Sequence, residues 1–269
     1  MYLLGPYLLG VTAANPELNW QTLPWLLAFA LYFTFPANLL VYGVNDIFDY
    51  DTDCLNPKKS GYESLVLPSE RASLLRTIAF SSTPFVVLLL LCHTPPLAAL
   101  YLIAFLLLSI FYSAPPIRAK VRPFLDSAFN LLYAMPGFFG WAFADGGRPQ
   151  TAILIAALAW TMAMHAYSAV PDINADREAG LSTVATVLGA RATVVGCLVL
   201  YALAAVLSVR YISGVGALLG TVYCALMLAS LAKDGRGYVM SLYKNFPLVN
   251  TVAGFIIFVA IFALKHLKV

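Results

Sequence analysis

The sequence predicts an all-α fold, a polytopic bundle of about nine transmembrane helices. Hydrophobic residues occupy 61% of the 269 positions and charged residues only 11%, against about 45–50% and about 25% in soluble domains. A helix needs about 20 apolar residues to cross the hydrocarbon layer of a membrane, and apolar runs of this length recur along the chain. Because no soluble stretch interrupts them, we expect residues 1–269 to form a single membrane domain.

Hydropathy and helix-breaking residues divide the chain into nine apolar segments. The first is too short to span a membrane alone, so either this helix is partial or the true start of the chain lies upstream. Proline and glycine inside the segments are tolerated where neighbouring helices satisfy the freed backbone groups. The segments are 1–14, 23–44, 73–92, 96–113, 124–144, 150–170, 191–209, 211–231 and 247–265.

Basic residues are distributed unevenly between the loops on the two sides of this bundle. Twelve fall in the even-numbered loops, namely Lys58, Lys59, Arg71, Arg76, Arg118, Lys120, Arg122, Arg177, Arg191, Lys233, Arg236 and Lys244. The other side holds Arg148, Arg210, Lys265 and Lys268. The positive-inside rule therefore places the even loops in the cytoplasm of a protein integral to the cell membrane. The same assignment puts every acidic cluster on the cytoplasmic side.

Charge and cysteine content argue against a nucleic-acid partner, a disulfide framework and a zinc site. The net charge is only +3, and the basic residues form no patch interleaved with aromatic side chains, so no nucleic-acid partner is expected. The four cysteines are widely separated and form no CxxC pair. Neither a disulfide framework nor a zinc site is indicated.

The first polar motif is NDIFDYDTD, residues 45–53, at the predicted cytoplasmic end of the second span. On a helix, Asp46, Asp49 and Asp53 share one face, with Asn45 beside them. Like charges this close repel each other, and carboxylates beside hydrocarbon are costly. A magnesium ion removes the conflict, because it binds one or two carboxylates together with substrate phosphates. The alternative is an acidic helix end that is merely solvated.

The second motif is PDINADREAG, residues 171–180, at the predicted cytoplasmic end of the sixth span. Asp172 and Asp176 are four residues apart and therefore share a helical face. The motif occupies a position in the second half of the chain that matches the first motif. We expect both acidic sets to face one cytoplasmic cavity, where magnesium would bridge a diphosphate and neutralise the leaving group.

The third motif is YSAPPIRAK, residues 112–120, between the fourth and fifth spans. Two prolines stiffen this loop, which presents Arg118 and Lys120 on the same side as the aspartates. Arginine suits bidentate phosphate binding, and lysine acts as a point charge. Because membrane topology alone also explains basic residues here, the motif does not by itself decide between phosphate binding and orientation.

Together these residues resemble the UbiA family of intramembrane prenyltransferases, over nearly the whole chain. Residues 45–53 match the family pattern NDxxDxxxD, residues 172–176 match its second DxxxD, and YSAPPIRAK is similar to its basic loop. The resemblance implies an isoprenyl diphosphate substrate and Mg²⁺ as cofactor. The implied metal ligands are Asn45, Asp46, Asp49, Asp53, Asp172 and Asp176. The implied diphosphate-binding residues are Asn45, Arg118 and Lys120, and the residues implied for catalysis include Asp49, Asp176 and Lys120.

Longer strings resemble one branch of the family, whose members prenylate lycopene in making long carotenoids. NDIFDYDTDCLNPKK, RPFLDSAFNLLYAMPG and MHAYSAVPDINADREAG carry this similarity. The resemblance implies transfer of a dimethylallyl group to a lycopene-like acceptor, which enters sideways from the membrane lipid. The alternative within the family is an aromatic acceptor of the quinone type, such as 4-hydroxybenzoate or a naphthoate.

Five further polar or aromatic residues lie near the motifs. Tyr112 and Tyr167 are candidate catalytic residues, because an aromatic face stabilises an allylic cation by about 0.5–2 kcal/mol, although tyrosine is common at membrane interfaces. His165 lies about 10 Å deeper than the second motif by helical rise. It is either a packing residue or a substrate-binding group at the acceptor. Asp126 and Asn130 either polarise the cavity or join helices by hydrogen bonds.

Two other classes of membrane protein use acidic residues. A transporter would place ionisable residues near mid-span and break matching helices in its two halves, whereas the acids here cluster at helix ends. The CDP-alcohol phosphotransferases require DGxxAR after their first aspartates, where this chain reads DYDTDC. Prenyl transfer therefore remains the favoured function.

Overall fold

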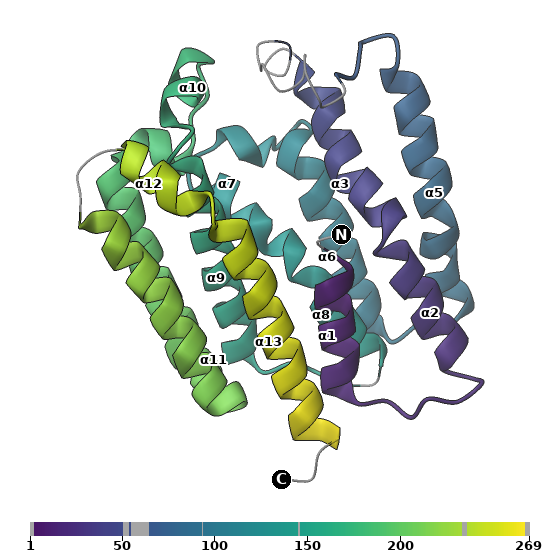
Figure 1. Cartoon of the computed structure of the whole chain (residues 1–269). Coiled ribbons are helices and arrows are strands. Elements are labelled where there is room, and N and C mark those ends of the chain that lie inside the picture. The colour runs from purple at the N-terminus through teal and green to yellow at the C-terminus, as the bar shows by residue number, and fades with distance from the viewer. Residues whose placement is uncertain are drawn as a thin grey trace. The chain divides into compact units, whose positions relative to one another are not determined.

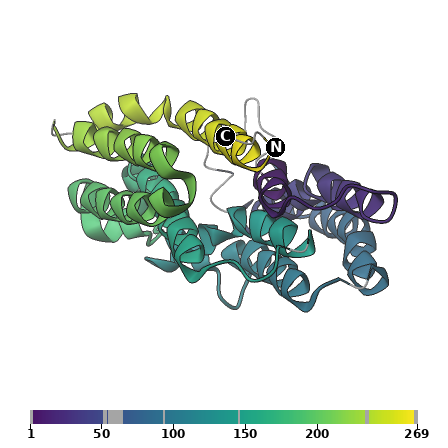
Figure 2. The ribbon, with the colours of Figure 1, turned by 90° about the horizontal axis from the view of Figure 1, so that it is seen from below.

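The protein is described by a computed structural model over residues 3–50, 54, 65–92, 94–144, 146–232 and 236–266. Every regular element within these ranges is a helix (Figure 1), which confirms the all-α prediction for them. The helices form two compact units. The first unit comprises Met1–Arg118 and Met135–Asp145, and the second comprises Ala119–Ala134 and Gly146–Val269. Figure 2 views the helices of each unit from below.

Within the described residues, the first unit contains six α-helices of different lengths. Its helices are α1 (Leu4–Ala14), α2 (Leu23–Tyr32), α3 (Phe35–Phe48), α5 (Arg71–Leu91), α6 (Pro96–Ser113) and α8 (Met135–Phe143). Helices α2 and α3 together form one candidate span, Leu23–Phe48. The span is interrupted at Thr34, whose ψ of −95° is not helical, and Pro36 restarts the helix, as expected for a residue that lacks an N–H and suits the first helical turn.

Small residues allow α1 and α8 to pack closely against each other. A Cβ on Gly10 would lie 1.9 Å from the Gly137 carbonyl oxygen, so no larger residue fits there. Membrane helices commonly use such small residues, because the hydrophobic effect does not drive them together. An aromatic core fills the adjacent space, with Tyr7, Phe33 and Phe139 fully buried and in ring contact.

The second unit is built on α9 and the long element α11. Its helices are η1 (Ala119–Val121), α7 (Leu125–Ala128), η2 (Phe129–Tyr133), α9 (Thr151–Ala169), α10 (Ile173–Glu178), α11 (Val184–Leu231), α12 (Arg236–Tyr243) and α13 (Phe246–His266). Element α11 turns back at Ile212 and Ser213, whose backbone angles are not helical. A Cβ on Gly220 would lie 2.2 Å from the Ala205 Cβ, so the two halves lie side by side. They correspond to the predicted spans 191–209 and 211–231.

All nine predicted apolar segments contain helix within the described residues. Six helical stretches there are long and apolar enough to cross a membrane, and α1 is short, as predicted. The fifth segment, 124–144, differs from a regular span, because α7, η2 and α8 divide it into short pieces. The chain passes from the second unit to the first inside this segment, at Ala134 and Met135. Whether residues 1–269 act as one domain stays a prediction.

Candidate active site

The first acidic motif lies where α3 and α6 end together in the first unit. The Asn45 amide nitrogen donates a hydrogen bond to the Ser113 hydroxyl at 3.0 Å, so α6 orients the Asn45 side chain. This bond uses the amide nitrogen and not the amide oxygen, which is the atom that a hard cation prefers. Asp46 is half-buried, and Asp49 is only 7% exposed. Oxygen donors thus gather at one helix end.

The helix in this motif is shorter than predicted. Helix α3 ends at Phe48, and Asp49 follows it with φ −107° and ψ 4°, so Asp46 and Asp49 do not share one continuous helix. The C-terminal end of a helix carries partial negative charge, which disfavours further carboxylates and favours a cation. Asp53 lies outside the described residues, and its predicted role stays a prediction.

Arg71 is a cation near this motif that lies outside the three sequence motifs. It is the first residue of α5, and its guanidinium carbon lies 5.7 Å from the centre of the Tyr50 ring. Helix α5 approaches α3 at Gly43, where a Cβ would lie 2.9 Å from the Ile78 Cδ1 atom. In the sequence, the feature that could have indicated Arg71 is its place at the start of the apolar segment that follows the first acidic motif.

The second acidic motif surrounds α10 in the second unit. Asp172 is exposed and precedes α10 as its N-terminal cap residue, and Asp176 is half-buried. The Asp176 N–H donates to the Asp172 carbonyl oxygen at 2.9 Å, which confirms that the two residues share a helical turn. The Thr183 hydroxyl donates to Asp176 Oδ2 at 3.2 Å. Burial raises the pKa of Asp176, and the charges of Asp172 and Asp126 raise it further.

The basic loop contributes two half-buried cations. Arg118 adopts the left-handed backbone conformation with φ 45°, which is strained for a side-chain-bearing residue and recurs at ligand sites. Its Nε atom is buried and makes no hydrogen bond to another described residue. Burial lowers the pKa of Lys120 to about 8. Lys120 therefore stays largely protonated at neutral pH, and diphosphate binding by the two residues stays a prediction.

The remaining predicted residues lie on the spans next to the motifs. Tyr112 is half-buried in the last turn of α6, close in sequence to Ser113. Tyr167 is fully buried on α9, where its hydroxyl lies 2.9 Å from the Ser230 hydroxyl and its ring packs against Phe246. This environment makes Tyr167 a core residue of the second unit. His165 is half-buried on the same helix. The catalytic and substrate-binding roles of these residues stay predictions.

The oxygen donors of the motifs suit a magnesium ion that also binds substrate phosphates, and they do not suit a metal ion whose ligands all come from the protein. Among the described residues, no group of three or more His, Cys, Asp or Glu side chains could hold a metal ion. Magnesium is typically bound by one or two carboxylates, with substrate phosphates and water completing its shell. Asp46 with Asp49, and Asp172 with Asp176, each offer one or two carboxylates, and their binding of Mg²⁺ stays a prediction.

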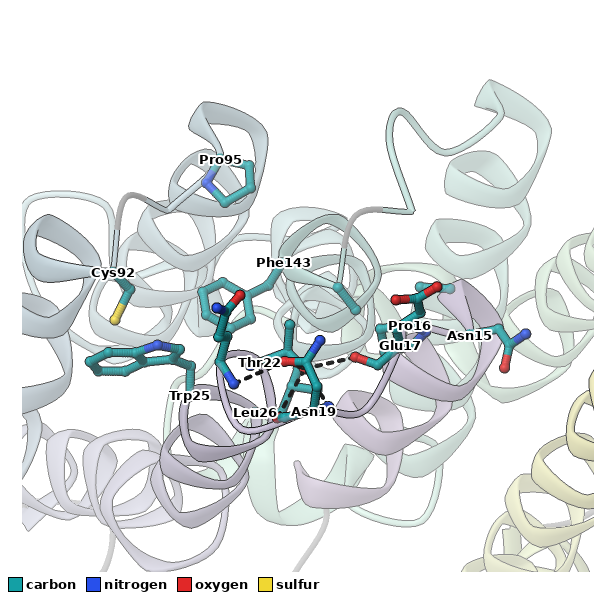
Figure 3. Close-up of a pocket in the computed structure, with 13 residues that line it drawn as sticks. Asn15, Pro16, Glu17, Asn19, Thr22, Trp25, Leu26, Cys92, Pro95 and Phe143 are labelled. Carbon is teal, nitrogen blue, oxygen red and sulfur yellow. Dashed lines mark hydrogen bonds between the residues drawn. The ribbon is translucent and has the colours of Figure 1, made fainter.

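A pocket of about 600 Å³ lies in the first unit, between the start of α2 and the ends of α1, α5 and α8 (Figure 3). Its lining includes Glu17, Trp25, Leu26 and Phe143. At a rise of 1.5 Å per residue, Leu26 lies roughly 28 Å along α2 and α3 from Asn45. None of the predicted site residues that the structure describes lines this pocket, so it is separate from Asn45, Asp46 and Asp49.

Comparison with known proteins identifies the family. Residues 3–238 match the model of the UbiA prenyltransferase family. The chain is 38% identical over 257 residues to a protein of Haloarcula japonica named lycopene elongase/hydratase, covering 95% of this chain and 85% of the relative.

Solved structures of low sequence identity share the fold. A UbiA homolog from Aeropyrum pernix K1 matches with a TM-score of 0.73 and 18% identity, over 97% of this chain and 95% of that one. A UbiA homolog from Archaeoglobus fulgidus, solved with DMAPP and Mg²⁺, matches with a TM-score of 0.62 and 20% identity, over 96% and 94%. The sequence matches together with this shared fold show that the chain belongs to the UbiA prenyltransferase family.

Proposed function

We propose that this prenyltransferase transfers a dimethylallyl group from its diphosphate to lycopene in carotenoid biosynthesis. The observation that carries the proposal is the 38% identity, over 95% of the chain, to a protein named lycopene elongase/hydratase. The donor is proposed because an isoprenyl diphosphate, DMAPP, is bound with Mg²⁺ in a structure that shares this fold.

The acidic motifs supply the oxygen ligands for magnesium in this proposal. Asn45, Asp46 and Asp49 contribute from the end of α3, together with Asp53, and Asp172 and Asp176 contribute from α10. When bound there, Mg²⁺ neutralises charge on the diphosphate and makes it a better leaving group. Because carboxylates and a diphosphate are both anionic, these residues would hold the substrate through the bound metal.

Cationic and aromatic side chains complete the proposed chemistry. Arg118 binds phosphate oxygens through its planar guanidinium, and Lys120 adds a point charge. Tyr112 offers its ring face to the developing allylic cation. His165 contacts the acceptor, whose terminal double bond attacks the cation before water adds or a proton leaves.

The proposed active site opens to the cytoplasm, and lycopene enters sideways from the lipid. The excess of Lys and Arg in the even loops supports this orientation. Cys54 is exposed beside the first motif, so a membrane-impermeant maleimide should label it in inverted vesicles but not in intact cells. The variant Cys54→Ser is the control for labelling of other cysteines, and labelling of Cys54 in intact cells would reverse the orientation.

Expression in a host that accumulates lycopene tests the acceptor. Pigment mass analysis should show lycopene converted into products that carry one or two added prenyl groups. The variant Asp49→Ala, expressed at the same level, should leave lycopene unchanged. If the wild-type protein leaves lycopene intact but prenylates 4-hydroxybenzoate or a naphthoate in membranes, the carotenoid proposal is wrong and the aromatic alternative is correct.

A further inference from the structure

We propose that Asp126 is a positioning residue that holds the second acidic motif in the geometry that binds a divalent cation. The inference rests on the proposed function, because it takes Asp172 and Asp176 as metal ligands. It also decides between the two interpretations that the sequence left open for Asp126, a polar group in the cavity and a link between helices.

The Asp126 carboxylate is fully buried and engaged in hydrogen bonds through both oxygens. Its Oδ1 atom accepts from the Ser127 N–H at 2.8 Å and from the Ser127 hydroxyl at 3.3 Å. Its Oδ2 atom accepts from the Val184 N–H at 2.7 Å. The Asn130 amide nitrogen donates to the Asp126 carbonyl oxygen at 2.7 Å. Asp126 is therefore built as an anchor and not as a metal ligand.

The contact with Val184 links this anchor to the acidic motif. Val184 is the first residue of α11, and Thr183 before it caps the helix. Thr183 and Thr186 form a reciprocal capping box, in which each hydroxyl accepts from the other residue's N–H, at 3.3 Å and 2.8 Å. The same Thr183 hydroxyl donates to Asp176 Oδ2 at 3.2 Å. The hydrogen bonds to Asp126 and to Asp176 are therefore made by two adjacent residues, Val184 and Thr183.

The segment between α10 and α11 is folded back onto itself. The Leu181 N–H donates to the Asp176 carbonyl oxygen at 2.8 Å, and the Arg177 guanidinium donates to the Thr186 carbonyl oxygen at 2.9 Å. These bonds make the motif and the start of α11 one local structure. The Asp126 bond to Val184 ties that structure to α7.

The Asp126 carboxylate accepts hydrogen bonds from backbone N–H groups at this position. The first N–H groups of α11 have no partner within the helix, and the Asp126 carboxylate accepts the hydrogen bond of the Val184 N–H. Hydrogen bonds to a carboxylate are shorter and roughly twice as strong as neutral ones. An asparagine at this position would keep one acceptor for Val184, but it would lose the charge and a second acceptor for Ser127.

Two substitutions test the proposal without requiring turnover. Asp126→Asn weakens the anchor, and Thr183→Val breaks the next link while leaving Asp126 intact. For each, we expect the Mn²⁺ concentration at half-saturation, measured by electron paramagnetic resonance on metal-titrated protein in detergent, to rise about tenfold or more. Amide hydrogen exchange of residues 181–186 in metal-free protein should also accelerate. Ser127→Ala is the matched control, because it keeps both backbone bonds to Asp126 and should bind Mn²⁺ like wild type.

The outcomes separate this inference from the proposed function. If Asp126→Asn and Thr183→Val fold, bind Mn²⁺ like wild type and show unchanged exchange, the inference is wrong, even if their turnover falls. If Asp126→Asn does not fold, Thr183→Val decides the question alone. If wild-type protein binds Mn²⁺ with the expected dependence on Asp126 but does not prenylate lycopene, the inference holds and the acceptor proposal fails.

Discussion

The two acidic motifs contain similar side chains but are supported in different ways. In the first unit the carboxylates follow the C-terminal end of a 14-residue helix, and Asp49 is 7% exposed. In the second unit they lie at the start of a six-residue helix, where Asp172 is exposed and Asp176 is half-buried. The first motif is positioned by a hydrogen bond between two helices, from Asn45 to Ser113, whereas the second is positioned by a hydrogen bond from the loop before α11, from Thr183 to Asp176.

The electrostatic environment of the two motifs differs as well. A helix C-terminus is unfavourable for anions, and a helix N-terminus is favourable. The first motif therefore depends more strongly on a bound cation for its local charge balance. The second motif gains from the dipole of α10, but burial and neighbouring carboxylates still raise the pKa of Asp176. Both motifs thus favour a cation, for different physical reasons.

The largest expected effect tests whether the two motifs are equally necessary. We expect Asp49→Ala and Asp176→Ala each to lower prenyl transfer about a thousandfold, because each removes charge that the departing diphosphate requires. Transfer to lycopene in proteoliposomes measures this loss, and gel filtration with circular dichroism shows whether the fold is kept. Retained product formation by both folded variants would remove the metal-binding assignment, and loss in only one would show that the motifs are unequal.

Ser113→Ala tests the support of the first motif. Without the Ser113 hydroxyl, Asn45 loses the bond that orients its amide, and we expect transfer to fall by about 10- to 100-fold. The matched control is Ser109→Ala on the same helix, a buried residue whose hydroxyl makes no hydrogen bond to another described residue. Equal effects of the two substitutions would show that helix packing, and not the orientation of Asn45, determines activity.

The sequence predicted the spans and the motif positions, because apolar length and carboxylate spacing are local signals. It did not predict how the motifs are supported. Asn45 and Ser113 are 68 residues apart, and Asp126 and Val184 are 58 apart, so no periodicity marks either pair. Each of these hydrogen bonds forms only because the ends of two helices meet in the folded protein.

Two local features were also beyond a reading of the sequence pattern. The spacing of the aspartates by three and then four residues predicted a longer helix, but helix α3 ends at Phe48. The spacing of residues carries no information about the helix dipole, which disfavours carboxylates at a helix C-terminus. Tyr167 has the residue type and position of a catalytic aromatic, but its hydroxyl and ring are engaged in the core of the second unit. Composition alone cannot separate a buried aromatic from one that faces a substrate.

The pH dependence of substrate capture should separate the two cations of the basic loop. An arginine guanidinium in general keeps its charge over the accessible pH range. Burial lowers the pKa of Lys120 to about 8, so this side chain is charged below pH 8 and loses its proton above it. If Lys120 binds diphosphate, kcat/KM for the prenyl diphosphate should fall by up to about tenfold between pH 7 and pH 9, because this parameter reports the free enzyme.

Lys120→Arg is the control for this profile. Arginine keeps its charge, so the decrease above pH 8 should disappear in the variant even if its absolute rate is lower. A decrease that persists unchanged in Lys120→Arg would assign the titration to another group and remove Lys120 from diphosphate binding.

The smallest expected effect comes from Ser230→Ala, the counterpart of Ser113→Ala in the second unit. Ser230 bonds to Tyr167, five residues before Asp172, and not to a proposed metal ligand. Losing this bond should lower the free energy of unfolding by about 0.6 kcal/mol, the average for hydrogen bonds between membrane helices, while prenyl transfer stays within about twofold of wild type. Thermal unfolding in detergent and the transfer assay measure the two quantities. A large loss of prenyl transfer with unchanged stability would instead indicate that Ser230 orients Tyr167 for a role at the reacting centre.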